Sequence, residues 1–134
     1  MMARILLVDD DPAVLLFVAI VLVRDGFSVA KAASAEEAIS CIARDDFDLV
    51  ITDFRMPGKS GDAVVTSIRE RRREAKVIII SGYPNEIPEW LRSDTAGVRI
   101  LAKPFSVSEL RKAVGAAIGD GNKGWTADAM RAAS

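Results

Sequence analysis

The stretch that decides the fold is Ile5-Leu6-Leu7-Val8-Asp9-Asp10-Asp11-Pro12, close to the N-terminus. Four aliphatic residues run directly into three aspartates and a proline, so a buried strand is predicted to end where a helix begins. Asp11 would cap that helix, because an aspartate before a proline at the first helical position satisfies unpaired backbone amides. The stretch therefore predicts a strand, a short acidic turn and a helix.

The same pattern of a strand followed by a helix repeats along the chain. Runs such as Ile78-Ile79-Ile80 are continuously apolar, which is typical of parallel strands covered on both faces. Strands are predicted at 4–8, 28–31, 49–52, 77–80 and 98–102, and helices at 12–25, 35–44, 61–73, 88–94 and 107–118. This alternation predicts one α/β domain, a doubly wound parallel sheet of five strands with right-handed crossovers.

Composition excludes several classes of function. The chain has 134 residues, a net charge of −1, one cysteine and no histidine, so it has no internal disulfide, no histidine metal ligand and no phosphohistidine. The near-neutral charge argues against direct nucleic-acid binding, and the basic run at residues 69–73 is interpreted as a solvated helix end. The longest apolar run, residues 13–23, is shorter than the roughly 20 residues of a membrane-spanning helix. A soluble, cytoplasmic protein without membrane contact is therefore expected.

Polar residues follow four of the predicted strands. Asp9 and Asp10 follow the first strand, Asp53 the third, Ser81 the fourth and Lys103 the fifth. Parallel strands end at one edge of a doubly wound sheet, where ligands bind, so these side chains should converge. Each of these features is common in ordinary turns and helix caps, and only their joint occurrence indicates a site.

Converging carboxylates repel one another by about 4 kcal/mol per pair at 4 Å and an effective dielectric constant of 20. Either their pKa values rise or a cation binds. A set of ligands without histidine or cysteine favours a hard cation such as Mg²⁺. Lys103 and Ser81 would then contact phosphoryl oxygens, and Asp53 would be the nucleophile, since aspartyl phosphates are an established use of that side chain.

These residues occur in four motifs of recognisable order and spacing, namely residues 5–12, residues 53–61, Ser81-Gly82 and Lys103-Pro104-Phe105. Together they resemble the receiver domain of two-component response regulators over about residues 3–119, which leaves residues 120–134 as a tail without an output domain. The resemblance implies a flavodoxin-like sheet of strand order 2-1-3-4-5. It also implies a phosphorylation switch, not an enzyme, which receives its phosphoryl group from a histidine kinase or a phosphotransfer protein and loses it by self-catalysed hydrolysis.

The resemblance also implies a role for each site residue. Asp53 corresponds to the phospho-acceptor, Asp10 to the direct Mg²⁺ ligand, and Asp9 to an acidic partner that acts through water. The backbone carbonyl of Arg55 corresponds to a further metal ligand. Ser81 corresponds to the hydroxyl that turns toward the phosphoryl group, and Lys103 to the lysine that pairs with it, with a cis bond to Pro104.

Three positions depart from the usual pattern of this family. Ile100 stands where many receivers have an aromatic residue that moves together with the hydroxyl, so the usual coupling is in doubt. Arg55 and Tyr83 flank the site two residues after Asp53 and Ser81. Our hypothesis is that these two side chains restrict the attacking water and set the lifetime of phosphorylated Asp53; the alternative is that they are solvated loop residues.

The first predicted helix has no polar face over residues 13–23, whereas a surface helix normally shows an apolar stripe opposite polar residues. We expect an inward face of Val14, Phe17, Val18, Val21 and Leu22, and an outward face of Leu15, Leu16, Ala19 and Val23. An exposed apolar patch usually marks an interface. The predicted partner of the outward face is the helical bundle of the kinase or phosphotransfer protein, or a second copy in a homodimer.

Other interpretations remain open or are disfavoured. The same domain could be the receiver of a hybrid histidine kinase or of a longer response regulator. A flavin-binding flavodoxin would need a phosphate cradle rich in serine, threonine and glycine after the first strand, where this chain has aspartates. A hydrolase of the haloacid dehalogenase type would need an Asp-x-Asp-x-Thr pattern there, and the threonine is missing.

Overall fold

The computed structural model describes residues 3–92 and 97–119. Residues 1–2, 93–96 and 120–134, which include the predicted tail, lie outside the described residues. Strands and helices alternate along the described chain, as predicted. The elements are β1 (Arg4–Val8), α1 (Pro12–Arg24), β2 (Ser28–Ala32), α2 (Ala35–Arg44), β3 (Leu49–Asp53), α3 (Gly61–Arg71), β4 (Lys76–Ser81), the 3₁₀ turn η1 (Pro84–Glu86), α4 (Glu89–Arg92), β5 (Val98–Ala102) and α5 (Val107–Ile118).

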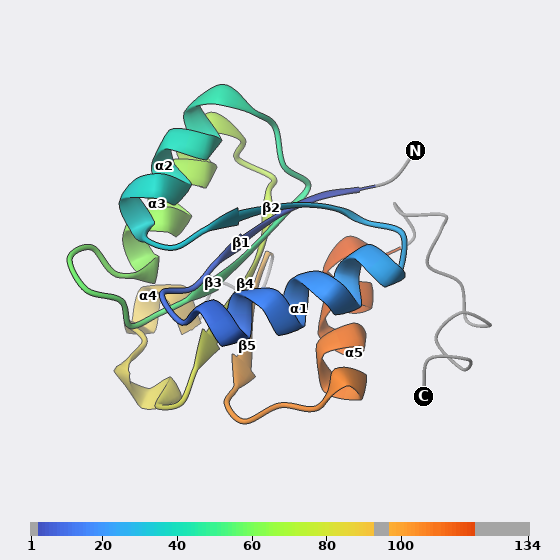
Figure 1. Ribbon diagram of the computed structural model, residues 1–134. Helices are drawn as coiled ribbons and strands as arrows, with labels where there is room; N and C mark the ends of the chain where they lie inside the picture. Colours follow the sequence, from blue (N-terminus) through green and yellow to red (C-terminus); the bar gives the residue numbers. More distant parts are fainter. Residues whose placement is uncertain (1–2, 93–96, 120–134) are drawn as a thin grey trace.

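The five strands form one parallel sheet in the order β2-β1-β3-β4-β5. This confirms the predicted doubly wound α/β fold and its flavodoxin-like strand order. In Figure 1, α1 and α5 cover one face of the sheet, and α2 and α3 cover the other. The strand order reverses beside β1, because β2 lies on one side of it and β3 on the other, which is where open α/β sheets place their ligand sites.

Side chains of the central strands supply two cores. Along β1, Ile5 and Leu7 pack toward α1 and α5, whereas Leu6 and Val8 pack toward α2 and α3. All four are fully buried, because a strand points alternate side chains to opposite faces and both faces are covered. This explains why the sequence of each central strand is continuously apolar.

Three helices begin at the predicted residues 12, 35 and 107, and a side chain caps each of them. Asp11 accepts a hydrogen bond from the amide of Ala13 at the start of α1. Ser34 caps α2, and Ser106 forms a reciprocal capping box with Glu109 at the start of α5. These bonds satisfy amide groups that have no partner within the helix.

The exposed face of α1 differs from the prediction. Ala19 is buried, so the prediction that it faces outward was wrong, and Phe17, predicted to face inward, is 41% exposed. Leu15 is half-buried and packs against the core beside the sheet. The exposed apolar stripe, here called the α1 stripe, consists of Leu16, Phe17, Ile20 and Val23. The inward face is therefore rotated by about one residue from the predicted one.

The fourth helix begins one residue later than predicted. A 3₁₀ turn over Pro84–Glu86 precedes α4, whose described part is Glu89–Arg92. Pro88 was predicted as the first helical residue, but it lies before the helix, where its carbonyl accepts hydrogen bonds from the amides of Leu91 and Arg92. The end of the predicted helix falls outside the described residues. Within the described ranges, no helix is long and apolar enough to cross a membrane.

Candidate functional site

The sheet brings the predicted site residues to one edge. Asp9 follows β1, Asp53 is the last residue of β3, Ser81 is the last residue of β4, and Lys103 follows β5. Because all the strands are parallel, these positions lie at the same carboxyl edge. Backbone hydrogen bonds tie the strand ends together there: Phe54 donates to the carbonyl of Ile80, and the Lys103 amide donates to that of Ser81 at 2.9 Å.

Three carboxylates meet at this edge. Asp9, Asp10 and Asp53 each offer one carboxylate oxygen, and these three oxygens lie within 4.8 Å of one another. Asp9 and Asp53 are buried, with 1% and 7% exposure, whereas Asp10 is exposed. The cluster is therefore open to solvent on the side of Asp10 and enclosed on the side of the sheet.

Lys103 balances part of this negative charge. Its Nζ lies 3.5 Å from Asp9 Oδ2 and 3.4 Å from Asp53 Oδ2. The ammonium group thus bridges the two buried carboxylates, as the predicted convergence of the strand ends requires. The bond between Lys103 and Pro104 is cis, as the family resemblance implied.

Burial dominates the electrostatics of the two enclosed carboxyls. Burial raises the pKa of Asp9 above its ordinary value, and the hydrogen bond from Asp11 and the nearby Lys103 offset only part of that rise. Burial also raises the pKa of Asp53, and the neighbouring charge of Asp9 adds to it. Both carboxyls therefore resist ionisation, which an added cation would relieve.

The donor set fits a hard divalent cation. Asp9 Oδ1 accepts a hydrogen bond from the amide of Asp11 at 2.9 Å. Asp9 Oδ2 is buried and accepts none from the described residues, although Lys103 Nζ lies at ion-pair distance. An unsatisfied buried carboxylate oxygen beside two further carboxylates forms an all-oxygen set of the kind that Mg²⁺ and Ca²⁺ prefer. The residues present could therefore hold such a metal.

The backbone behind Asp53 is held by a close approach of the chain to itself. A Cβ atom on Gly61 would lie 2.7 Å from the Asp53 carbonyl oxygen and 3.0 Å from Phe54 Cα. The Gly61 amide donates to the Phe54 carbonyl at 2.8 Å. Only a glycine leaves room for the start of α3 to pack against the end of β3, and this contact supports the loop that carries Arg55.

Comparisons with known proteins agree with this architecture. The family model for the response regulator receiver domain matches residues 5–115. This chain belongs to that family.

Relatives of this receiver share both sequence and fold. Transcriptional regulatory protein AruR of Pseudomonas aeruginosa is 32% identical over 115 residues, which cover 82% of this chain and 47% of AruR. The receiver thus spans about half the length of that relative. Chemotaxis protein CheY4 of Vibrio cholerae is 26% identical with a TM-score of 0.78, over 87% of this chain and 99% of that chain. Response regulator TrrA of Thermotoga maritima, in complex with Mg²⁺–BeF, is 34% identical with a TM-score of 0.72, over 86% and 98% of the two chains.

Of the four predicted switch and modulating residues, Ser81, Arg55 and Tyr83 lie at or just beyond this edge, and Ile100 lies in the middle of β5. The Ser81 hydroxyl accepts a hydrogen bond from the Tyr83 amide at 2.9 Å. Ile100, on the outer strand β5, is 36% exposed. Arg55 and Tyr83 contact each other, with the guanidinium carbon 5.5 Å from the centre of the tyrosine ring.

Sequence reasoning missed Glu86, which forms an ion pair with Arg55. The two residues are 31 positions apart in different loops, so no local spacing connects them. The only signal in the sequence was an acidic residue between Pro84 and Pro88, in a segment that had no assigned role. Its position depends on the path of the loop, which the 3₁₀ turn sets.

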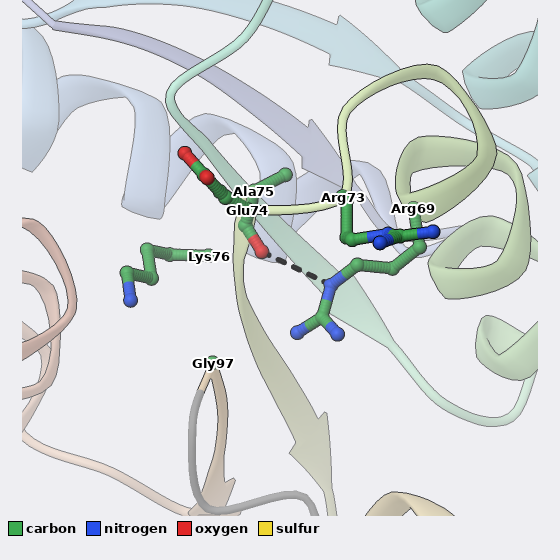
Figure 2. Close-up of a pocket in the computed structure, with 6 residues that line it drawn as sticks. All are labelled: Arg69, Arg73, Glu74, Ala75, Lys76 and Gly97. Carbon is green, nitrogen blue, oxygen red and sulfur yellow. Dashed lines mark hydrogen bonds between the residues drawn. The ribbon is translucent and has the colours of Figure 1, made fainter.

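A pocket of about 190 Å³ lies far from the carboxylates of this receiver, at the amino ends of β4 and β5 (Figure 2). The Arg69 Nε–H donates to the Ala75 carbonyl at 3.1 Å. A Cβ on Gly97 would lie 2.6 Å from Arg69 Nη2, so the glycine makes space for the guanidinium. The pocket belongs to the packing of α3 against the sheet and not to the acidic site. It is lined by Arg69, Arg73, Glu74, Ala75, Lys76 and Gly97.

Proposed function

We propose that this receiver accepts a phosphoryl group on Asp53 from a histidine kinase or a phosphotransfer protein. The observation that carries the proposal is the Asp53 carboxylate at the end of β3, beside two further carboxylates and 3.4 Å from the Lys103 ammonium. A carboxylate held between an acidic set and a single cation suits phosphoryl transfer, because that reaction depends on positioning and on charge compensation.

The reaction is an in-line displacement at phosphorus. An Asp53 oxygen forms the new O–P bond while the bond between phosphorus and the donor's histidine nitrogen breaks, and the electron pair stays on that nitrogen. Lys103 pairs with a phosphoryl oxygen as a point charge, and the Ser81 hydroxyl donates to another. Loss of the group by hydrolysis requires a water molecule to attack the same phosphorus.

Mg²⁺ is the proposed cofactor. Asp9, Asp10 and Asp53 would hold it together with the backbone carbonyl of Arg55, and TrrA is a relative described in complex with Mg²⁺–BeF. When bound, the ion offsets negative charge on the carboxylates and on the phosphoryl oxygens. The raised pKa values of Asp9 and Asp53 support this role, because a cation favours the ionised carboxyls.

Arg55 and Tyr83 are proposed to limit the access of water to phosphorylated Asp53. Their contact places a guanidinium and an aromatic ring together between the loops that follow β3 and β4. If they shield phosphorus, Arg55→Ala and Tyr83→Ala should each hydrolyse the acyl phosphate faster than wild type. Equal hydrolysis rates in all three proteins would contradict this role.

The partner is proposed to dock on the α1 stripe. Leu16 and Val23, two of the residues predicted to face outward, are 57% and 58% exposed, and Phe17 and Ile20 join them. The Phe17 ring lies 6.4 Å from that of Phe105, two residues after Lys103, so the stripe continues toward the acidic site. A histidine-bearing helical bundle seated there would reach Asp53; self-association through the same stripe is the alternative.

Intact mass tests the central proposal. The protein is incubated with Mg²⁺ and acetyl phosphate beside Asp53→Asn, and beryllofluoride binding is followed in parallel because the acyl phosphate can be short-lived. We expect one phosphoryl adduct in wild type and none in the variant. A folded wild-type protein with neither an adduct nor beryllofluoride binding would contradict the proposal and indicate a binding module without phosphorylation.

A further inference from the structure

Three side chains join the two loops beside the acidic site. Arg55, in the loop after β3, forms an ion pair through Nη2 with Oε1 of Glu86, in η1. The same guanidinium lies over the ring of Tyr83, 5.5 Å from its centre. Arg55 therefore contacts the loop after β4 at two points, and we name its pair with Glu86 the Arg55–Glu86 latch.

The latch is connected to the Ser81 hydroxyl by a short chain of hydrogen bonds. The Tyr83 amide donates to Ser81 Oγ at 2.9 Å, and the Glu86 amide donates to the Tyr83 carbonyl at 2.9 Å. Ser81, Tyr83 and Glu86 thus belong to one bonded turn. Arg55 holds this turn from the opposite loop, so a change in the partner of Arg55 changes the restraint on Ser81.

We propose that Glu86 is a positioning residue that holds the Arg55 guanidinium away from Asp53 until a phosphoryl group competes for it. This inference rests on the proposed phosphorylation of Asp53. A phosphoryl group carries more negative charge than a carboxylate and offers arginine a two-pronged pair of hydrogen bonds. Arg55 is anchored only two residues from Asp53, whereas its present partner lies in the other loop.

Solvent exposure makes this exchange feasible. The Arg55 and Glu86 side chains are 68% and 36% exposed, and exposed ion pairs are weak and easily replaced. When Arg55 turns to the phosphoryl group, Glu86 loses its partner and the turn loses its restraint. The hydrogen bond from the Tyr83 amide to Ser81 Oγ can then break, and the Ser81 hydroxyl can move toward the phosphoryl group. This change in the partner of Arg55 would couple phosphorylation of Asp53 to the loop before α4. The coupling would not need an aromatic residue at position 100, where this chain has isoleucine.

Beryllofluoride, a mimic of the phosphoryl group, tests the exchange in the full chain with Mg²⁺ and titration calorimetry. We expect Glu86→Gln to tighten beryllofluoride binding about two- to fivefold, the range typical of one exposed ion pair. Glu86→Asp, which keeps the charge, should restore most of the wild-type affinity. Arg55→Gln should bind beryllofluoride more weakly than wild type. Adding Glu86→Gln to the Arg55→Gln variant should then leave the affinity for beryllofluoride unchanged. The matched control is Glu89→Gln, which removes the same charge from a residue paired with Arg92 and should leave the affinity unchanged.

Amide hydrogen exchange without Mg²⁺ or beryllofluoride gives an independent measurement. Glu86→Gln should speed exchange at the Tyr83 and Glu86 amides, and Glu89→Gln should not. Three results would overturn the latch in a wild-type protein that binds beryllofluoride. The first is that Glu86→Gln still tightens binding in the Arg55→Gln background, and the second is that Glu89→Gln tightens binding as much as Glu86→Gln does. The third is that Glu86→Gln leaves exchange at the Tyr83 and Glu86 amides unchanged. Failure of wild type to bind beryllofluoride overturns the proposed function itself, and the latch with it.

Discussion

At the scale of single residues, Gly61 has a role that its flexibility does not explain. A methyl group there would lie 2.7 Å from the Asp53 carbonyl oxygen, whereas one on Gly82 would meet no atom within 4 Å. Overpacking against backbone costs about 1–3 kcal/mol, so Gly61→Ala should lower the free energy of unfolding by that amount and Gly82→Ala should not. Urea denaturation of the two variants measures this, and equal stabilities would show that the end of β3 yields to the added methyl.

Asp9 shows the cost of assembling the acidic site. Its carboxyl is 1% exposed, and burial raises its pKa, so the folded protein prefers the protonated form more than the unfolded chain does. The stability from this preference is complete below the unfolded value of about 3.9 and is lost as pH rises through the folded pKa. At pH 7.5 without Mg²⁺, Asp9→Asn should therefore have a larger free energy of unfolding than wild type.

The comparison for this variant is Asp10→Asn, the same change on an exposed neighbour, which should stabilise the protein less. Both variants are measured by urea denaturation at pH 7.5 and pH 4.5. The difference in the free energy of unfolding between Asp9→Asn and wild type should shrink at the lower pH. A difference that is equal at both pH values would mean that the buried charge of Asp9 is not its cause.

At the scale of elements, α1 shows what its sequence could not determine. Helix orientation is normally visible because polar residues mark the solvent side, but eleven consecutive residues, 13–23, are apolar. The sequence therefore predicts the helix and its cap correctly, but it places Phe17 on the buried side and Ala19 on the exposed side, which is the reverse of what the structure shows. Packing decides the rotation: Val18 and Leu22 are fully buried, and Ala19 is the small residue beside them.

Adjacent residues of α1 test this orientation. Ala19→Glu would bury an unpaired charge and should destabilise the protein by more than about 3 kcal/mol, whereas Ile20→Glu, at a position 48% exposed, should change the stability by less than about 0.5 kcal/mol. Thermal unfolding and sedimentation velocity measure both variants. If wild type self-associates through the α1 stripe, Ile20→Glu should be monomeric; a stable Ala19→Glu protein would contradict the observed rotation.

The fourth helix and the latch show a second limit of sequence reasoning. The central strands β1, β3 and β4 were predictable because each is built on a short aliphatic run. The convergence of the site residues was predictable because they stand at or just after strand ends. The segment from Pro84 to Pro88 has two prolines and no clear periodicity, so neither η1 nor the late start of α4 could be derived. The position of Glu86 beside Arg55 depends on that local path, which is why their ion pair could not be foreseen.

At the scale of the whole molecule, the proposed metal binding at the acidic edge would be linked to the stability of the entire domain. A ligand that binds only the folded state stabilises it by about 2.7 kcal/mol at a concentration one hundred times its Kd. The site draws on strands from the centre to the margin of the sheet, so binding there opposes unfolding of the sheet as a unit. The charge that destabilises the metal-free protein is the same charge that would bind the proposed metal.

This linkage predicts a response to Mg²⁺ that depends on pH. Since the raised pKa values of Asp9 and Asp53 mean that metal and protons compete for the same oxygens, the gain in Tm from Mg²⁺ should be larger at pH 8 than at pH 5. Thermal unfolding with Mg²⁺ or with EDTA, at matched ionic strength, measures the gain. The double variant Asp9→Asn with Asp53→Asn should lose it at both pH values. A gain that is the same at pH 5 and pH 8, or that survives in the double variant, would place the metal elsewhere on the molecule.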